Sequence, residues 1–339
     1  YQMAGLLASS FAFALILPLL LAAACLARLK RKILPLSTNQ KPRLVWAGVA
    51  IGSLHTASNA LKSAGFDSIC IASTIYENID LEKFDTIIGP QKRLPFGFNT
   101  LFRTVHAGAV FTAIMFQRDV LHGFFNGAVL GKTPLAEWEY LLWKVSGGKL
   151  ILLPYGSDSF VYRKFPDEPW ANAIKQTYPR SDLQDRQIET RINQFTEKAD
   201  CVVGCIVHDC CLPRVDERTV LWYPFDTSLE PEYPDLSGTI KIAHSTNHRK
   251  IKGTDALISA VNDLKQAGYR IDLTIIENKS HSQVTEIYRA ADIVVDQLLF
   301  GYAFSALEGL ALGKPVITGV TNEPLYQPYL ALEQMQENP

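Results

Sequence analysis

Short apolar runs alternate with longer amphipathic runs along most of the chain after residue 40. Leu44–Val49 has the continuous apolar character of a buried strand, and a helical spacing of apolar residues follows over His55–Ala64, ending at Gly65. A second strand is predicted over Ser68–Ala72. Because strands that alternate with helices favour a parallel sheet covered by helices, the pattern predicts an α/β fold.

The same alternation continues and then starts again in the second half of the chain. Residues 226–238 between the halves are rich in acidic residues and proline, which is typical of a linker. We therefore expect two Rossmann-like domains, 41–225 and 239–339, that face a cleft. Further strands are predicted at 85–88, 149–153, 201–203, 240–243, 271–277 and 292–296, and helices at 134–145, 182–198, 254–267 and 283–290.

The N-terminal segment is the most apolar part of the chain. Residues 3–27 are interrupted only by two serines, and the run exceeds the roughly 20 residues that a helix needs to cross the hydrocarbon core. Arg28, Lys30, Arg31 and Lys32 follow it, so the positive-inside rule places the rest of the chain in the cytoplasm. We expect 1–33 to be a transmembrane anchor with a basic flank. A secretory signal and a buried core helix are the alternatives.

The amino-acid composition bears on whether the protein binds nucleic acid or metal ions and whether it contains disulfides. The 33 basic and 34 acidic side chains nearly cancel, so the basic surface of a nucleic-acid binder is not expected. The 6 cysteines show no spacing typical of a disulfide framework. Cys201, Cys205, His208, Cys210 and Cys211 crowd together, but the spacing matches no standard metal-ligand pattern, and a buried strand accounts for them better than a metal site does. No metal is expected.

In the first half of the chain, the candidate functional residues lie in the loops after predicted strands. The loop Gly48–Gly52 lacks the third glycine of a dinucleotide-binding loop. Gly52 either lets a substrate approach the backbone or belongs to a tight turn.

Two polar clusters, 119–127 and 153–160, follow apolar segments and are expected at the mouth of the sheet. There His122 would exchange a proton and Asp158 would accept a hydroxyl of a bound ligand. The alternatives are a satisfied, partly buried imidazole for His122 and a turn cap for Asp158.

In the second half, a basic loop precedes a predicted helix. Arg249, Lys250 and Lys252 stand before Gly253, and cations beside free helix N–H groups suit a diphosphate, although a solvated basic loop is the alternative. Glu308 is expected in the first turn of a later helix, where a carboxylate can accept two ribose hydroxyls. Ser305–Glu308 also matches a capping box.

Several of these stretches together resemble the donor half of GT-B glycosyltransferases, especially the family 4 type. Lys252-Gly253 matches that family's Lys-Gly after a basic loop, and Glu308–Ile317 matches the second half of its Glu-x7-Glu motif and the following strand. Gly156–Asp158 resembles a loop of the acceptor half, and Tyr288–Asp296 resembles the segment before the motif. The resemblance covers most of residues 43–320.

The resemblance implies transfer of a sugar from a nucleotide-sugar donor to a glycan or lipid-linked acceptor, with retention and without an obligatory metal cofactor. The predicted membrane anchor would place this activity at the cytoplasmic face of a membrane and favours a lipid-linked or surface glycan as the acceptor. Together with the positions expected at the sheet edges, the candidate residues are Asp158 and His122 for catalysis, Gly52 and Tyr155 for the acceptor, and Arg249, Lys252, Gly253, Gly301, Tyr302 and Glu308 for the donor.

Three positions depart from the family pattern. Phe300 stands where the first motif glutamate is expected, Asn247 where an arginine is usual, with Arg249 as its replacement, and Tyr155 where histidine is common. A catalytically degenerate GT-B domain that binds a nucleotide sugar or a partner protein is therefore the alternative, and a sugar epimerase is a more distant one. Because the family continues beyond the last predicted strand, we expect the donor domain to be truncated.

Overall fold

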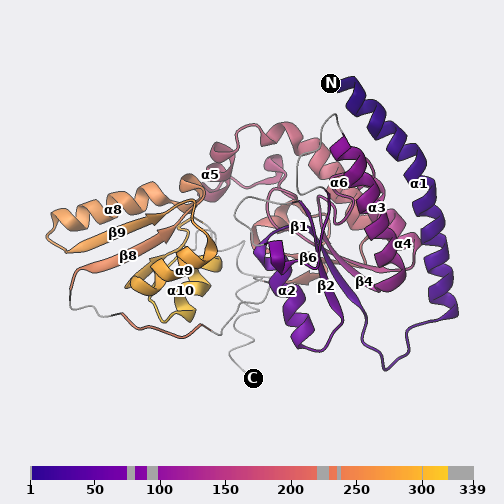
Figure 1. Ribbon diagram of the computed structural model, residues 1–339. Coiled ribbons are helices and arrows are strands. Elements are labelled where there is room, and N and C mark those ends of the chain that lie inside the picture. Colours follow the sequence, from indigo (N-terminus) through magenta and orange to yellow (C-terminus); the bar gives the residue numbers. More distant parts are fainter. Residues whose placement is uncertain are drawn as a thin grey trace. The chain divides into compact units, whose positions relative to one another are not determined.

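The computed structural model describes residues 2–74, 81–89, 98–219, 229–234, 238–299 and 301–319, with side chains from residue 13 onward except at 181 and 206. The chain divides into two compact units (Figure 1). Unit 1 comprises 1–160 and 186–224, and unit 2 comprises 161–185 and 225–339. The stretch 161–185 belongs with unit 2 because its helix α5 (Pro169–Thr177) packs against α7 (Arg249–Lys252). Residues 226–228 and 235–237 of the predicted linker, and Phe300, lie outside the described residues.

Unit 1 is built on a parallel, 7-stranded sheet with the order β3-β2-β1-β4-β5-β6-β7. Its strands are β1 (Leu44–Val49), β2 (Ser68–Thr74), β3 (Thr86–Ile87), β4 (Val120–Phe124), β5 (Lys149–Leu153), β6 (Cys201–Gly204) and β7 (Glu217–Arg218). Its helices are α1 (Gln2–Ile33), α2 (Gly52–Ser63), α3 (Phe98–Gln117), α4 (Glu139–Val145) and α6 (Asp185–Lys198), with short 3-10 turns at Leu81–Lys83, Ala136–Trp138 and Ile206–Cys211.

The central strands are apolar because both faces of the sheet are covered. Every residue of β1 is buried, as expected for a parallel strand between two helical layers. Figure 1 shows α2 on one side of the sheet and α3, α4 and α6 on the other. Leu54 of α2 packs with Trp46 and Phe124 in one core cluster. Gly48 makes this packing possible, since a Cβ there would lie 2.3 Å from the Phe124 ring.

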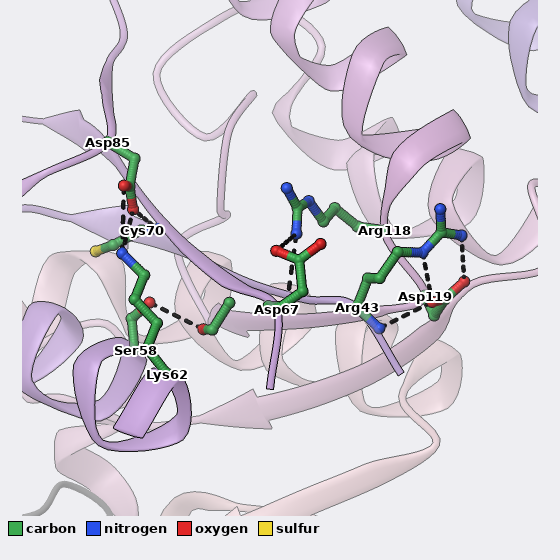
Figure 2. Close-up of polar contacts among 9 residues, drawn as sticks. Arg43, Ser58, Lys62, Asp67, Cys70, Asp85, Arg118 and Asp119 are labelled. Carbon is green, nitrogen blue, oxygen red and sulfur yellow. Dashed lines mark hydrogen bonds and ion pairs between the residues drawn. The ribbon is translucent and has the colours of Figure 1, made fainter. Parts of the chain in front are cut away.

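Aspartates at the amino ends of strands hold neighbouring strands together (Figure 2). Asp85 Oδ2 accepts the Cys70 N–H at 2.7 Å, and Asp119 Oδ2 accepts the Arg43 N–H at 2.9 Å. The contact recurs at Asp200 with Leu150, Asp216 with Val202 and, in unit 2, Asp292 with Lys241. Backbone N–H groups that begin a parallel strand need acceptors, so these carboxylates serve the structure at the edge opposite to ligand sites.

Unit 2 contains a smaller parallel sheet of 4 strands in the order β11-β10-β8-β9. Tyr288, Val294 and Leu312 form the centre of one core cluster, and all are fully buried. The strands are β8 (Ile240–Ser245), β9 (Ile271–Ile276), β10 (Ile293–Val295) and β11 (Val316–Ile317). Besides α5 and α7, the unit contains α8 (Thr254–Gln266), α9 (His281–Ala290) and α10 (Phe304–Ala311), with 3-10 turns at Tyr162–Lys164 and Ser181–Gln184.

The predicted α/β class with parallel sheets is confirmed. The domain bounds 41–225 and 239–339 and the cleft between domains stay predictions. Residues 13–33 of α1 are long and apolar enough to cross a membrane, a test that a buried core helix and a signal sequence also pass.

Candidate functional site

Each sheet has a point where the strand order reverses direction. In unit 1 the reversal lies between β1 and β4, and in unit 2 it lies between β8 and β10. Open α/β sheets bind ligands outside the carboxyl ends of their strands at such points. The candidate sites are therefore the two carboxyl edges, and each is described within its own unit.

His244, the fifth residue of β8, joins three elements at the reversal point of unit 2. Its Nδ1 lies 2.9 Å from the Val295 carbonyl of β10, and its Nε2 lies 2.8 Å from Thr254 Oγ1 at the start of α8. Since the carbonyl can only accept, Nδ1 carries the proton and Nε2 accepts from the threonine hydroxyl. Burial lowers the pKa of His244, which keeps the ring neutral. The start of α8 is thereby fixed to the sheet.

Lys252 is directed to the same edge. Its Nζ lies 3.1 Å from Oδ1 of Asp296, a carboxylate that follows β10 and is fully buried. The second oxygen of Asp296 accepts the Ala303 N–H at 2.6 Å. Gly253 has a φ of 73°, and a Cβ there would lie 3.0 Å from Leu298. The Lys-Gly pair therefore anchors the loop before α10 as well as placing a cation at the edge.

A hollow of about 360 Å³ opens beside the start of α8, between α5 and α7. Arg249, Lys250, Gly253 and Asp255 are among the residues that line it. Arg249 makes a two-pronged, exposed ion pair with Glu277, at 2.9 and 3.1 Å, whereas Lys250 has no ion-pair partner among the described side chains. The first N–H groups of an α-helix lack intrahelical acceptors. The hollow thus combines cations with backbone donors, while Asp255 adds one opposing charge.

The structure corrects the expected position of Glu308. Helix α10 begins at Phe304, and its N-cap, Ala303, makes no side-chain cap hydrogen bond. Glu308 therefore lies in the second turn, and the capping-box interpretation of Ser305–Glu308 is wrong. Its Oε1 lies 2.6 Å from His281 Nε2 at the start of α9, with 10% of the Glu308 side chain exposed against 73% for His281. His281 is a neighbour that the sequence pattern did not suggest.

The loop with Gly301 and Tyr302 leads into α10. Gly301 has a φ of 62° and forms an isolated antiparallel bridge with Gly319. Thr318 Oγ1 donates to the Gly301 carbonyl at 2.9 Å. A Cβ on Gly319 would lie 1.9 Å from the Leu298 carbonyl oxygen, so only glycine fits there. These contacts fix the backbone around Gly301 at the carboxyl edge, directly before Tyr302.

In unit 1, Asp158 lies at the carboxyl edge after β5 and is 3% exposed. Its carboxylate accepts backbone N–H groups of Phe125, Tyr155 and Gly156 at 3.0–3.1 Å. Burial raises the pKa of Asp158 to about 7, against the lowering effect of these donors. This geometry is that of a turn cap, the alternative role for this residue. Contact with a hydroxyl of a ligand stays a prediction.

Beside Asp158 is a hollow of about 490 Å³ that sequence reasoning missed. Asn126 and Arg191 line it, and both have a buried polar atom without a hydrogen-bond partner, Oδ1 and Nε respectively. Asn126 Nδ2 donates to the Tyr155 hydroxyl at 2.7 Å, and Arg191 Nη2 donates to the Asp158 carbonyl at 3.1 Å. These two atoms are themselves buried, but the residues that line the hollow are mostly polar, as expected of a site for a hydroxylated ligand. Asn126 follows β4, but nothing in the sequence signals Arg191 in the middle of α6.

Glu139 shapes the loop next to this hollow. The fully buried carboxylate accepts the N–H groups of Ala128, Val129 and Leu130 at 2.6–2.9 Å. Burial raises the pKa of Glu139 to about 7, although the three donors lower it. The loop after β4 is therefore held by a side chain from α4.

The structure also corrects the position of His122. It lies inside β4 rather than at the sheet mouth, because Val120–Phe124 is a central strand of the sheet. Its ring stacks on Trp46 at 4.0 Å, and burial lowers its pKa to about 4. A role in proton exchange stays a prediction without a supporting contact. Gly52 is the first residue of α2, with nothing within 4 Å of a Cβ built on it.

The cysteines of the 201–211 stretch lie in β6 and the turn that follows it. Cys210 and Cys211 have their sulfur atoms 3.8 Å apart. Across the described residues, no group of three His, Cys, Asp or Glu side chains is arranged to hold a metal ion.

No family profile matches the chain, and no characterised protein matches it by sequence. Three solved structures with which it shares structural similarity are glycosyltransferases. The glycotransferase of kitacinnamycin has 12% identity and a TM-score of 0.43, covering 87% of this chain and 85% of its own. SnogD from Streptomyces nogalater has 13% identity, a TM-score of 0.36 and 85% coverage of both chains.

The third is a mutant O-GlcNAc transferase of Thermobaculum terrenum, with 11% identity and a TM-score of 0.43, covering 83% of this chain and 53% of its own. With identities of 11–13% and TM-scores below 0.5, these proteins are too distant to carry a functional argument.

Proposed function

We propose that this chain is a GT-B-type glycosyltransferase that moves a sugar from a nucleotide-sugar donor to a glycan or lipid-linked acceptor. The observation that carries the proposal is the carboxyl edge of unit 2. There the hollow at the start of α8, with its cations and free N–H groups, shares one sheet edge with the carboxylate of Glu308. A diphosphate suits the first feature and a ribose the second.

In this proposal the donor's leaving group is stabilised by charge. As the sugar–phosphate bond breaks, the departing nucleoside diphosphate gains negative charge. Lys250, Arg249 and the backbone donors at the start of α8 would lower the energy of that state because they are already in place. Lys252, held by Asp296, would contribute a further positive charge. Retention of configuration and the absence of an obligatory metal remain expectations from the family resemblance.

Unit 1 would supply the acceptor site. The hollow lined by Asn126 and Arg191, next to Tyr155 and Asp158, offers donors and acceptors for sugar hydroxyls. Such groups would orient the incoming hydroxyl, which lowers the barrier by positioning. Attachment to a membrane through α1 would favour a lipid-linked or surface glycan as the acceptor, with the catalytic part in the cytoplasm.

A domain that binds a nucleotide sugar or a partner protein without catalysis is the second candidate. The observation in its favour is that the Asp158 carboxylate already accepts three backbone N–H groups and His122 lies within the sheet. These contacts leave the two proposed catalytic side chains with structural roles.

The first test is calorimetry with a panel of nucleoside diphosphates, followed by sugar-transfer assays with the matching nucleotide sugars. Glu308→Ala and Lys250→Ala should each weaken nucleotide binding by roughly 1.5–3 kcal/mol, the usual loss for a charged hydrogen bond. Lys252→Ala should also weaken binding, but it strips the buried Asp296 of its partner, which destabilises the fold as well.

Exposed residues of the same unit serve as matched controls for the calorimetry. Glu286→Ala in α9 and Lys265→Ala in α8 remove the same charges and should leave affinity unchanged. Equal affinities for Glu308→Ala, Lys250→Ala and these controls would contradict the donor site. Binding without turnover of any nucleotide sugar would favour the second candidate.

A further inference from the structure

Helix α1 has two apolar faces with opposite surroundings. Leu20, Ala24 and Ala27 are at most 2% exposed, although they lie near the chain's N-terminus. The opposite face is exposed. Its exposed residues share one face because an α-helix turns about 100° per residue, which places them within about 80° of one another. These outer residues, 52–69% exposed, are Leu15, Leu19, Leu26, Leu29 and Ile33.

The inner face of α1 runs along α3 in the same direction (Figure 1). Near the middle of α1, Ile16 approaches Gly108, where an added Cβ would lie 3.2 Å away from it. Further along, Lys30 Nζ donates to the Phe116 carbonyl at 3.0 Å. The two helices are therefore packed side by side over several turns, and a glycine allows their close approach.

The end of α1 is tied to unit 1 by Arg31. Its Nη1 donates to the Ser146 carbonyl at 2.7 Å and its Nη2 donates to the Arg118 carbonyl. The guanidinium carbon also lies 5.7 Å from the centre of the Trp143 ring. A helix held this way along its length is part of the unit. If it crossed a bilayer instead, α3 and α4 would have to follow it into the hydrocarbon or lose these contacts.

A basic hollow of about 410 Å³ adjoins the end of α1, with Arg28, Lys32, Lys144 and Lys149 in its lining. Lys144 and Lys149 share one carboxylate, Asp200, at 2.8 and 3.1 Å. Neither Arg28 nor Lys32 has an ion-pair partner among the described residues. The hollow therefore has an excess of positive charge at the end of the helix that carries the open apolar face, and positive charge together with exposed apolar residues is the combination that anionic lipid surfaces attract.

We propose that unit 1 rests on an anionic lipid bilayer, with α1 lying in the plane of the interface instead of crossing it. The outer leucines of α1 enter the boundary between headgroups and acyl chains, and the basic hollow receives lipid phosphates. Trp138 adds an interfacial aromatic beside α1, with its ring 6.2 Å from that of Phe13. This placement differs from the transmembrane anchor expected from hydropathy, and it does not depend on the proposed sugar transfer.

The two topologies differ in where residue 2 lies relative to unit 2. We would label Gln2→Cys and Lys265→Cys variants of the full chain with a membrane-impermeant maleimide added to sealed vesicles. Peptide mass spectrometry would separate the new sites from the native cysteines. An in-plane helix leaves both sites on the same side of the membrane. Labelling from opposite sides would overturn the proposal.

The charge requirement is tested by vesicle flotation. Arg28→Ala/Lys32→Ala should weaken binding to phosphatidylserine–phosphatidylcholine vesicles about 25-fold, since each basic residue near an anionic surface contributes about fivefold. The matched control Lys265→Ala/Arg270→Ala removes two exposed cations of unit 2 and should bind as the parent does. Equal binding of the parent to pure phosphatidylcholine, or no loss in the first variant, would overturn the role of the basic hollow.

The apolar face is tested in the same assay. Leu19→Asn/Leu26→Asn should abolish flotation, while Leu264→Asn, an exposed leucine of unit 2, should not change it. Far-UV circular dichroism confirms that each variant is folded. Undiminished flotation of the folded Leu19→Asn/Leu26→Asn variant would refute insertion of this face.

Discussion

Asp158 and Glu139 each hold a loop of unit 1 by accepting three backbone N–H groups. Both are buried, and burial raises the pKa of each to about 7. The folded state therefore keeps a proton on these carboxyls at pH values where the unfolded chain has released it. Their contribution to stability is present below the ordinary carboxyl pKa and is lost as pH rises through about 7.

Unit 1 should accordingly become less stable between pH 4 and pH 7, and Asp158→Asn should flatten that dependence because it removes one titrating group. At pH 5 the variant should itself lose about 1–3 kcal/mol, since the amide cannot satisfy all three donors. Urea unfolding at several pH values measures both effects. Glu197→Gln, which is well exposed, is the control; if Asp158→Asn kept the parent's pH slope, the assignment would be wrong.

Among the strands and helices, close packing between neighbouring elements shows which glycines are required, a point that sequence motifs left open. Two glycines near the β1–α2 connection, Gly48 in β1 and Gly52 at the start of α2, have opposite surroundings. Gly48 faces the fully buried Phe124 ring, which has no room to move away, whereas Gly52 faces open space at the start of α2. The restrictive glycine is the one that the sequence pattern did not single out.

Gly48→Ala should cost about 1–3 kcal/mol by overpacking. Gly52→Ala should be neutral or stabilise by up to about 1 kcal/mol, because alanine favours the helix and restricts the unfolded chain. Thermal or urea unfolding of the two variants makes a matched comparison. A loss in Gly52→Ala equal to that in Gly48→Ala would show that packing against Phe124 is not the cause.

In the whole molecule, the proposed donor site involves residues of unit 2 alone, so a bound nucleoside diphosphate should protect one unit selectively. Hydrogen exchange should slow at the start of α8 and in α10, which carry the hollow and Glu308, and stay unchanged in β1 and β4 of unit 1. A ligand present at 100 times its dissociation constant should add about 2.7 kcal/mol to the stability of the unit that binds it. Protection confined to unit 1 would refute the assignment.

Local sequence patterns were sufficient to predict the α/β class, the parallel sheets and most strand positions, because a strand that is buried on both faces is a continuous apolar run, and glycines mark where the neighbouring elements end. They also placed the basic loop, Gly253 and Glu308 at the carboxyl edge of the second sheet. These features depend on local periodicity and on residues close together in the chain.

The partners of those residues, in contrast, depend on how distant segments pack together. Asp296 pairs with Lys252, His281 with Glu308, and Arg191 approaches Asp158, all across separations that no local pattern encodes. The same holds for α1: hydropathy describes how apolar a helix is, but whether α3 covers one of its faces depends on long-range packing. A sequence pattern indicates whether a residue will be buried or exposed. Which distant segment contacts that residue is determined by how the elements pack in the folded protein.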